Sequence, residues 1–204
     1  MPRPRSLTGG DLAAAALAVI DREGLSALTM RAVAKELGVA TMALYRYVPD
    51  RGALEVLVVE SVFGAVDTSV PAGLPWAERV EMLAERVRVA VGAHPQTVPL
   101  LLAHRQSARS GLRWMEAVLT VLTHAGFDGV DRVIAQRTLV GYLFGFLHNA
   151  HYASLAGDGT AALAEMSADE FPHLVATARS ARTVSAEEEF RGGLAIVLRG
   201  LRPH

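Results

Sequence analysis

Residues 29–48 read TMRAVAKELGVATMALYRYV, and they are the most informative segment of the chain. Its pattern predicts two short helices joined by a tight turn, the first over Met30–Leu37 and the second over Thr41–Tyr47. Gly38 can adopt the positive φ that ends the first helix. In a helix-turn-helix of this kind the second helix lies in the major groove of DNA.

The side chains of this segment separate into an inward set and an outward set. The inward residues are apolar and recur at helical spacing: Val33, Leu37, Val39, Leu44 and Val48. Ala34 is small where the second helix must approach the first. Thr41, Met42, Tyr45 and Arg46 are left facing outward. An ordinary helical hairpin has similar spacings, so on this segment alone both interpretations stay open.

The rest of the chain also predicts helices, and the expected fold class is all-α. Half of the 204 residues are hydrophobic and no run alternates with a period of two, which favours a globular helical protein. Thr68–Pro75 is the clearest linker, and a loop is expected to open at Gly157. The other helices are expected over Gly9–Glu23, Arg51–Val66, Trp76–Ala93, Thr97–Ala103, Ala108–Ala125, Val130–Leu155, Ala168–Ala181 and Ala186–Leu201.

Around the quoted segment the sequence resembles the tetracycline-repressor-like (TetR) family of bacterial regulators. The resemblance is carried by Leu28–Ala34, Leu37–Val39, Leu44–Val48 and the Ala53-Leu54 pair, all within about the first sixty residues. The remainder is similar to the tetracycline-repressor branch only loosely, in helix count and in the His94-Pro95 break.

The resemblance implies a domain organisation and a function. Residues 1–50 would form a three-helix helix-turn-helix DNA-binding domain, and residues 51–75 a connecting helix and linker. Residues 76–204 would form a larger helical domain for effector binding and dimerisation. The implied function is a transcriptional repressor that a small apolar or aromatic effector releases from a palindromic operator in double-stranded DNA. The effector, the operator, the regulated genes and activation instead of repression all stay open.

Seven residues are expected to contact DNA: Arg31, Thr41, Met42, Tyr45, Arg46, Tyr47 and Arg51. The family commonly places a DNA contact at the position of Arg31. Arg46 is the best candidate for a guanine, because its planar fork can bond O6 and N7 together. The hydroxyls of Tyr45 and Tyr47 suit phosphate oxygens, and Arg51 adds its charge to a helix N-terminus.

Two positions depart from the family pattern, and both concern which operator is read. Ala40 stands where the reading helix often begins with Ser or Thr, so Thr41 could cap the helix instead of contacting a base. Tyr47 stands where many relatives have His. Arg3 and Arg5 form a short basic arm, for which a DNA contact and a disordered tail are equally open.

The C-terminal half predicts a homodimer. From Thr138 to Ala156 there is no Asp, Glu, Lys or Arg, and a helix that is apolar all round must be covered on every side. Gly141 and Gly145 would permit close helix approach. The last helix has its own apolar stripe of Phe190, Leu194, Val197, Leu198 and Leu201. By resemblance these two helices would form a four-helix dimer bundle, since a two-fold operator needs two reading helices ~34 Å apart. A monomer core is the alternative.

An effector site is expected where polar residues stand in an apolar setting. The candidates are His94, His104, Trp114, Val118, Tyr142, Phe146, Asn149 and His151. Apolar walls with few polar groups describe a small-molecule site, and they equally describe a core with satisfied histidines. His148 and His151 have a spacing compatible with metal ligands, but no carboxylate or third histidine lies nearby in sequence. No metal and no cofactor are therefore predicted.

Composition excludes several other classes. The absence of cysteine excludes disulfides and thiolate metal sites. No secretory signal is recognised, and the longest apolar run, Thr138–Leu147, is about half the ~20 residues of a membrane span. A cytoplasmic protein with no membrane partner is expected. Catalytic motifs are missing, so an enzyme is not predicted. A helical enzyme and a helical interaction module without DNA remain the alternatives.

Overall fold

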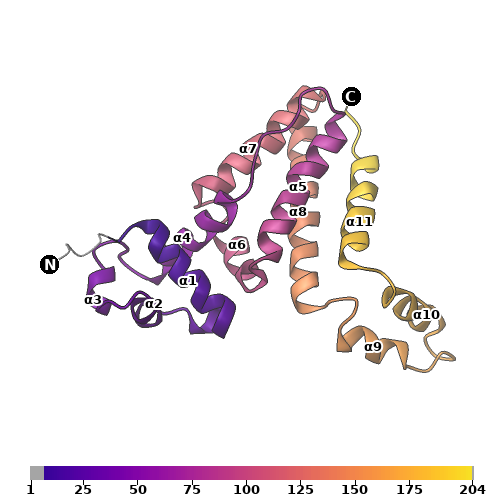
Figure 1. Cartoon of the computed structure of the whole chain (residues 1–204). Coiled ribbons are helices and arrows are strands. Elements are labelled where there is room, and N and C mark those ends of the chain that lie inside the picture. The colour runs from indigo at the N-terminus through magenta and orange to yellow at the C-terminus, as the bar shows by residue number, and fades with distance from the viewer. Residues whose placement is uncertain (1–6, 204) are drawn as a thin grey trace. The chain divides into compact units, whose positions relative to one another are not determined.

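The computed structural model describes residues 7–203, and every regular element in that range is helical (Figure 1). The all-α prediction is confirmed. Two short 3-10 helices, η1 (Leu25–Ala27) and η2 (Pro95–Thr97), accompany the α-helices. The α-helices are α1 (Gly9–Glu23), α2 (Met30–Glu36), α3 (Thr41–Leu44), α4 (Arg51–Gly64), α5 (Trp76–Gly92), α6 (Val98–His104), α7 (Arg109–His124), α8 (Gly129–Tyr152), α9 (Asp158–Ala164), α10 (Pro172–Ala181) and α11 (Ala186–Gly200). Arg3 and Arg5 lie outside the described residues.

Helix starts in the first half follow from local side-chain caps. The Thr8 hydroxyl accepts a hydrogen bond from the backbone of Asp11, whose carboxylate accepts one from the Thr8 backbone in return. The Thr29 hydroxyl caps α2 by accepting from the amide of Ala32 at 3.0 Å, and the Asp50 carboxylate caps α4 by accepting from the amide of Ala53 at 2.8 Å. These three polar residues therefore fix where α1, α2 and α4 begin.

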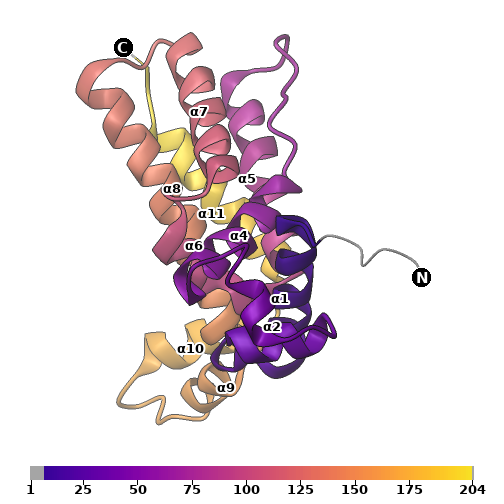
Figure 2. The ribbon, with the colours of Figure 1, turned by 90° about the vertical axis from the view of Figure 1, so that its left-hand side faces the viewer.

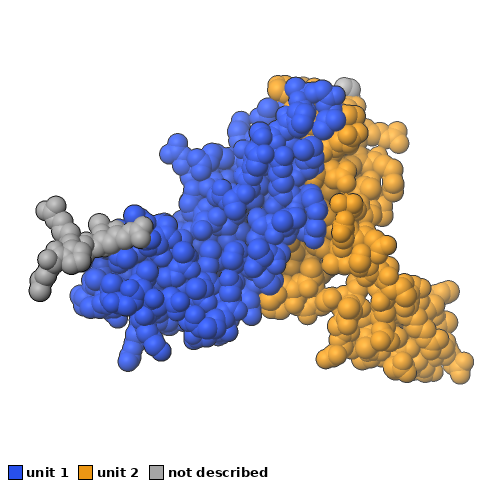
Figure 3. Space-filling model, in the orientation of Figure 1, with its two compact units in different colours: residues 1–74, 82–120 blue, residues 75–81, 121–204 orange. Residues whose placement is uncertain are grey.

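The contacts within the chain divide it into two compact units (Figure 3). Unit 1 comprises residues 1–74 and 82–120, and unit 2 comprises residues 75–81 and 121–204. Helices α5 and α7 each contribute to both units. The functional boundaries expected at residues 50 and 75 are a different kind of division and stay predictions.

Unit 1 is built around α4. This helix packs against α1 and against α6, as two views of the ribbon show (Figures 1 and 2). Leu54 and Val58 of α4 are fully buried, and so is Leu12 of α1. Trp114 is buried as well and donates its indole N–H to the carbonyl of Leu83 at 2.9 Å. The apolar stripe of α4 thus holds α1 and α6 on one core.

Unit 2 contains two helix pairs, α8 with α11 and α9 with α10. Phe190 of α11 is fully buried, and its ring lies 5.0 Å from that of Phe146 and 6.0 Å from that of Tyr142. Trp76 meets Phe127 edge to face at 5.3 Å. Across residues 7–203, no helix is long and apolar enough to cross a bilayer.

Several expected elements differ from those observed: α10 begins at Pro172 instead of Ala168, and α8 ends at Tyr152 instead of Leu155. The reading helix α3 ends at Leu44 instead of Tyr47, and turns follow in which Tyr47 and Val48 both donate to the carbonyl of Leu44. The helix cannot continue far, because Val48 precedes Pro49 and the α conformation is disfavoured there. The loop expected at Gly157 was wrong, since α9 begins one residue later. Good helix formers over residues 161–165 and Asp158 in the first turn outweigh the two glycines.

Candidate nucleic-acid interface

The corner between α2 and α3 is held by a small buried core. Val33, Ala34 and Leu44 are almost fully buried, as is Val48 after α3. Gly38 has φ +66°, and this left-handed residue lets Val39 donate to the carbonyl of Ala34 at 3.0 Å. Of the inward set, only Leu37 and Val39 remain half-buried. The core fixes α3 against α2 and thereby orients its outer face.

The outward residues of this segment lie together on the surface. Met42 is 75% exposed, and Tyr45, Arg46 and Tyr47 are exposed as well, while Thr41 is half-buried. Ala40 is the N-cap of α3 and offers no side-chain acceptor, and Thr41 is the first helical residue. Arg46 lies in the turn after α3, where its guanidinium has no ion-pair partner among the described residues.

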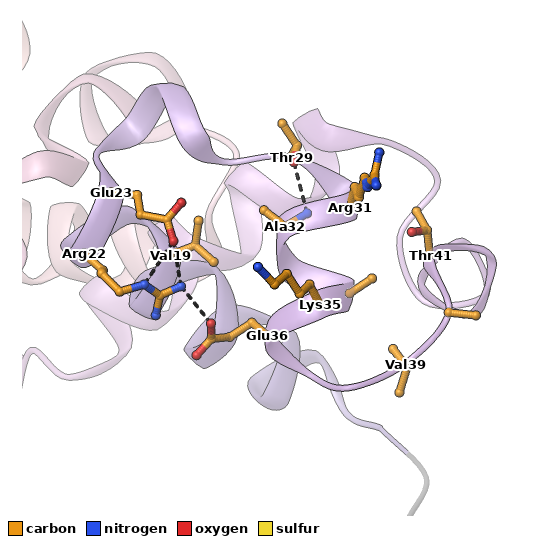
Figure 4. Close-up of a pocket in the computed structure, with 12 residues that line it drawn as sticks. Val19, Arg22, Glu23, Thr29, Arg31, Ala32, Lys35, Glu36, Val39 and Thr41 are labelled. Atoms are coloured by element: carbon orange, nitrogen blue, oxygen red, sulfur yellow. Dashed lines mark hydrogen bonds and ion pairs between the residues drawn. The ribbon is translucent and has the colours of Figure 1, made fainter.

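Beside this surface is an open cavity of about 670 Å³ between the end of α1, helix α2 and the start of α3 (Figure 4). Arg22 is neutralised here, because its guanidinium lies 2.9 Å from the carboxylates of both Glu36 and Glu23. The hydrogen bond to Glu36 raises the pKa of Arg22 most, and the one to Glu23 raises it further. Arg31 and Lys35 also line the cavity, and within residues 7–203 neither makes an ion pair.

Lys35 is a candidate that the sequence reasoning missed. It is the only lysine of the chain and stands four residues after Arg31, a spacing that places both residues on one face of α2, and both line the cavity. That i, i+4 spacing was the available signal. The two cations together make α2 a basic edge next to the outward face of α3.

Arg51 differs from the other cations because it is paired. Its Nε donates to Oε1 of Glu55 at 2.7 Å, and the other oxygen of that carboxylate lies 2.9 Å from Nε2 of His104. Arg51 is the first residue of α4, directly after the Asp50 cap. The structure thus gives a DNA-contact candidate and an effector candidate one shared partner.

The other effector candidates of unit 1 also have partners within that unit. His94 lies 2.7 Å from the carboxylate of Asp21, which is an ion pair when the histidine is protonated. Trp114 and Val118 are buried. These observations fit the alternative of satisfied core residues as well as they fit a binding site.

The effector candidates of unit 2 are Tyr142, Phe146, Asn149 and His151. Burial raises the pKa of Tyr142, and its hydroxyl donates to the carbonyl of Phe190 at 2.7 Å. Phe146 is buried and Asn149 is exposed, whereas half-buried His151 lies 4.4 Å from the ring of Tyr152. No cluster of three or more metal-ligating side chains occurs among residues 7–203. The effector site remains a prediction.

Both parts of the chain match a known family. Residues 12–54 match the family described as "Bacterial regulatory proteins, tetR family", and residues 71–204 match the "Tetracyclin repressor-like, C-terminal domain". The second match alone covers more than half of the chain. The chain belongs to the TetR family. The resemblance inferred from the Thr29–Val48 segment is confirmed.

Two curated relatives of this TetR-family chain are regulators from Streptomyces and Saccharopolyspora. It is 32% identical to the HTH-type transcriptional repressor DrrR1 of Streptomyces coeruleorubidus over 152 residues, which are 74% of this chain and 56% of DrrR1. A curated regulator from Saccharopolyspora erythraea is matched over 59% of its length. The chain therefore spans less than two thirds of these curated relatives.

Solved structures from the family cover nearly the whole chain. ActR of Streptomyces coelicolor, crystallised in complex with actinorhodin, is 25% identical with a TM-score of 0.82, covering 97% of this chain and 96% of ActR. A possible TetR family transcriptional regulator from Streptomyces coelicolor A3(2) is 28% identical with a TM-score of 0.86, covering 96% and 98% of the two chains. The described fold is thus the fold of the family.

Proposed function

We propose that this protein is a transcriptional repressor that binds a palindromic operator as a homodimer and releases it when a small apolar or aromatic effector binds. The observation that carries the proposal is the exposed basic surface on α2 and around α3. Arg31, Lys35 and Arg46 lie on it without ion-pair partners among the described residues. Cations that are not neutralised within the protein are available to replace the counterions of phosphates.

The residues of this surface are suited to different contacts. Arg46 can bond O6 and N7 of a guanine, while Thr41 and Met42 stand at the start of α3, where side chains reach base edges. Tyr45 and Tyr47 have hydroxyls that suit phosphates. Arg31, Lys35 and Arg51 would add charge-assisted phosphate bonds, which fix the register of the protein on DNA.

Two relatives support the direction of regulation and the class of effector. DrrR1 is a transcriptional repressor, and at 32% identity it favours repression over activation here. ActR was crystallised in complex with actinorhodin, which supports a small-molecule effector for this chain. We place the effector among His94, His104, Trp114, Val118, Tyr142, Phe146, Asn149 and His151. Binding would shift the equilibrium between DNA-competent and incompetent dimers, which requires different affinities for the two states.

A second copy of the chain would cover the exposed apolar face of α8 and α11. Val130 of α8 and Ile196 of α11 are 72% and 64% exposed. Gly141 and Gly145 are exposed on the same face of α8, and no atom lies within 4 Å of a Cβ added at either. Exposed apolar surface rimmed by polar residues is typical of an interface, and a two-fold dimer supplies the two reading heads of a palindrome.

A repressor function has consequences for where the protein is located and for whether it catalyses a reaction. A repressor acts where the bacterial chromosome is, so we infer a cytoplasmic protein. We also infer that it binds its effector without transforming it, because the family consists of regulators and the surface described above serves binding.

The decisive experiment measures binding to the DNA upstream of its own gene by fluorescence anisotropy at several salt concentrations. Arg46→Ala should weaken specific binding by about 1–3 kcal/mol while leaving binding to random DNA nearly unchanged. Lys35→Ala should weaken both alike and lower the salt slope by about 1 for each subunit. Arg179→Ala, an exposed arginine of α10, is the control and should change neither. Absence of salt-dependent binding would favour the interaction module without DNA.

A further inference from the structure

Glu55 of α4 uses both of its carboxylate oxygens. Oε1 accepts from Nε of Arg51 at 2.7 Å, and Oε2 lies 2.9 Å from Nε2 of His104. Arg51 is the first residue of α4, and His104 is the last residue of α6. An ionised carboxylate only accepts, so Nε2 of His104 carries the proton of this bond. One carboxylate therefore connects the N-terminal end of α4 to the C-terminal end of α6.

The two contacts differ in their exposure. The side chains of Glu55 and His104 are 16% and 23% exposed, whereas that of Arg51 is 48% exposed. The Glu55–His104 contact is therefore less accessible to solvent and salt than an ordinary surface pair. Glu55 engages only Nε of Arg51, which leaves the two terminal nitrogens of the guanidinium for another acceptor.

A second carboxylate on α4, that of Glu60, bonds the chain shortly after α6. Glu60 accepts from the backbone amide of Ser110 at 2.9 Å and also from its hydroxyl, next to the start of α7. Glu55 and Glu60 thus attach α4 to the end of α6 and to the beginning of α7. Short bonds thus attach the chain to α4 on both sides of the connection between α6 and α7.

We propose that Glu55 and His104 are positioning residues for a DNA phosphate contact made by Arg51. The bond from His104 holds the carboxylate of Glu55 so that it meets Nε of Arg51 alone. Without this bond the carboxylate can turn and accept from Nε and a terminal nitrogen together, which is the arrangement that arginine–carboxylate pairs favour. One of the two terminal nitrogens would then no longer be available to the phosphate, and the carboxylate would neutralise more of the guanidinium charge. This inference rests on the proposed DNA-binding function, and it makes the end of α6 a determinant of DNA affinity.

The test is a double-mutant cycle on the full chain, with binding to the upstream DNA fragment as the measurement. Arg51→Gln should weaken binding about 5-fold and lower the salt slope by about one per subunit. His104→Leu should weaken binding by about 3-fold or more and lower the salt slope in the same way. His104→Gln keeps an N–H donor and should remain close to the original chain. In the Arg51→Gln background, His104→Leu should have no further effect.

The cycle separates positioning from packing. If His104→Leu weakens binding equally in both backgrounds, or if His104→Gln is as weak as His104→Leu, then His104 acts only through the packing of α6 and the proposal is overturned. If His104→Leu caused general misfolding, DNA binding would weaken in both backgrounds, and that result also counts against the proposal. If Arg51→Gln has no effect while Arg46→Ala does, the repressor proposal stands and the positioning proposal fails. If neither arginine matters, both fail.

Discussion

Replacing Gly193 by alanine should weaken the packing of α8 on α11. A Cβ at Gly193 would lie 2.7 Å from Cε2 and 2.8 Å from Cζ of Tyr142, and it would also contact the hydroxyl. The ring is held in place, because that hydroxyl donates to the carbonyl of Phe190 at 2.7 Å. Overpacking costs about 1–3 kcal/mol, and loss of the hydrogen bond costs about 1 kcal/mol. Alanine recovers about 1 kcal/mol of helix propensity. The free energy of unfolding should therefore fall by about 1–3 kcal/mol.

Urea unfolding at one fixed protein concentration measures this loss, because dimerisation would make the stability concentration-dependent. Gly159→Ala in α9 is the control, since no atom lies within 4 Å of its added Cβ, and it should be neutral or slightly stabilising. In a Tyr142→Leu background, Gly193→Ala should also cease to destabilise, because the obstructing ring is gone. If Gly193→Ala in the original chain proved as stable as its parent, the reasoning that Tyr142 is held against α11 would be refuted.

Three further outcomes are expected. Gly38→Ala should cost about 1–2 kcal/mol of stability in thermal unfolding, because residue 38 has φ +66°, and Gly38→Asn should cost less. Thr29→Ala should cost about 1 kcal/mol by removing the α2 cap, while Thr29→Ser should retain it. Burial raises the pKa of Glu60, but hydrogen bonds from Ser110 outweigh burial and lower it overall. Its stabilisation is therefore present above the ordinary carboxyl pKa and is lost as the pH falls through the lowered value. Glu60→Gln should flatten the acid side of a pH–stability curve. Ser110→Ala should also flatten it, and the double variant should be no flatter than Glu60→Gln alone.

The helix ends of the first half could be predicted from sequence because their causes are local. Thr8, Thr29 and Asp50 each bond a backbone amide three residues later, so the partner is fixed by spacing alone. Gly24 and Gly38 end their helices with positive φ, which depends on the residue itself. Such features need no knowledge of the tertiary structure.

The length of α3 and the existence of α9 could not be predicted as securely. Residues Tyr45–Tyr47 continue the helical pattern of the sequence. In the structure, however, Val48 is buried directly ahead of Pro49, and α4 begins two residues after Pro49. The Gly157–Gly159 segment resembles a loop, yet α9 is stabilised by packing against α10. Burial of Val48 and packing of α9 against α10 therefore add to the local causes, which are Pro49 for α3 and the helix formers over residues 161–165 for α9.

In the candidate site, the sequence alone does not show which cations are neutralised by a carboxylate. Arg22, Arg31 and Arg51 are equivalent as basic residues in the sequence, but Arg22 is neutralised by Glu36, fourteen positions later, and Arg51 is bound by Glu55. The partner of Glu55 is His104, which is 49 positions away and can be found only once α4 and α6 are packed together. A search for DNA contacts selects cations and passes over an acidic residue, because a carboxylate repels phosphate. An acidic residue whose two oxygens are both engaged can nevertheless favour DNA binding, since the direction that it imposes on an arginine decides whether the positive charge reaches the phosphate or is neutralised within the protein.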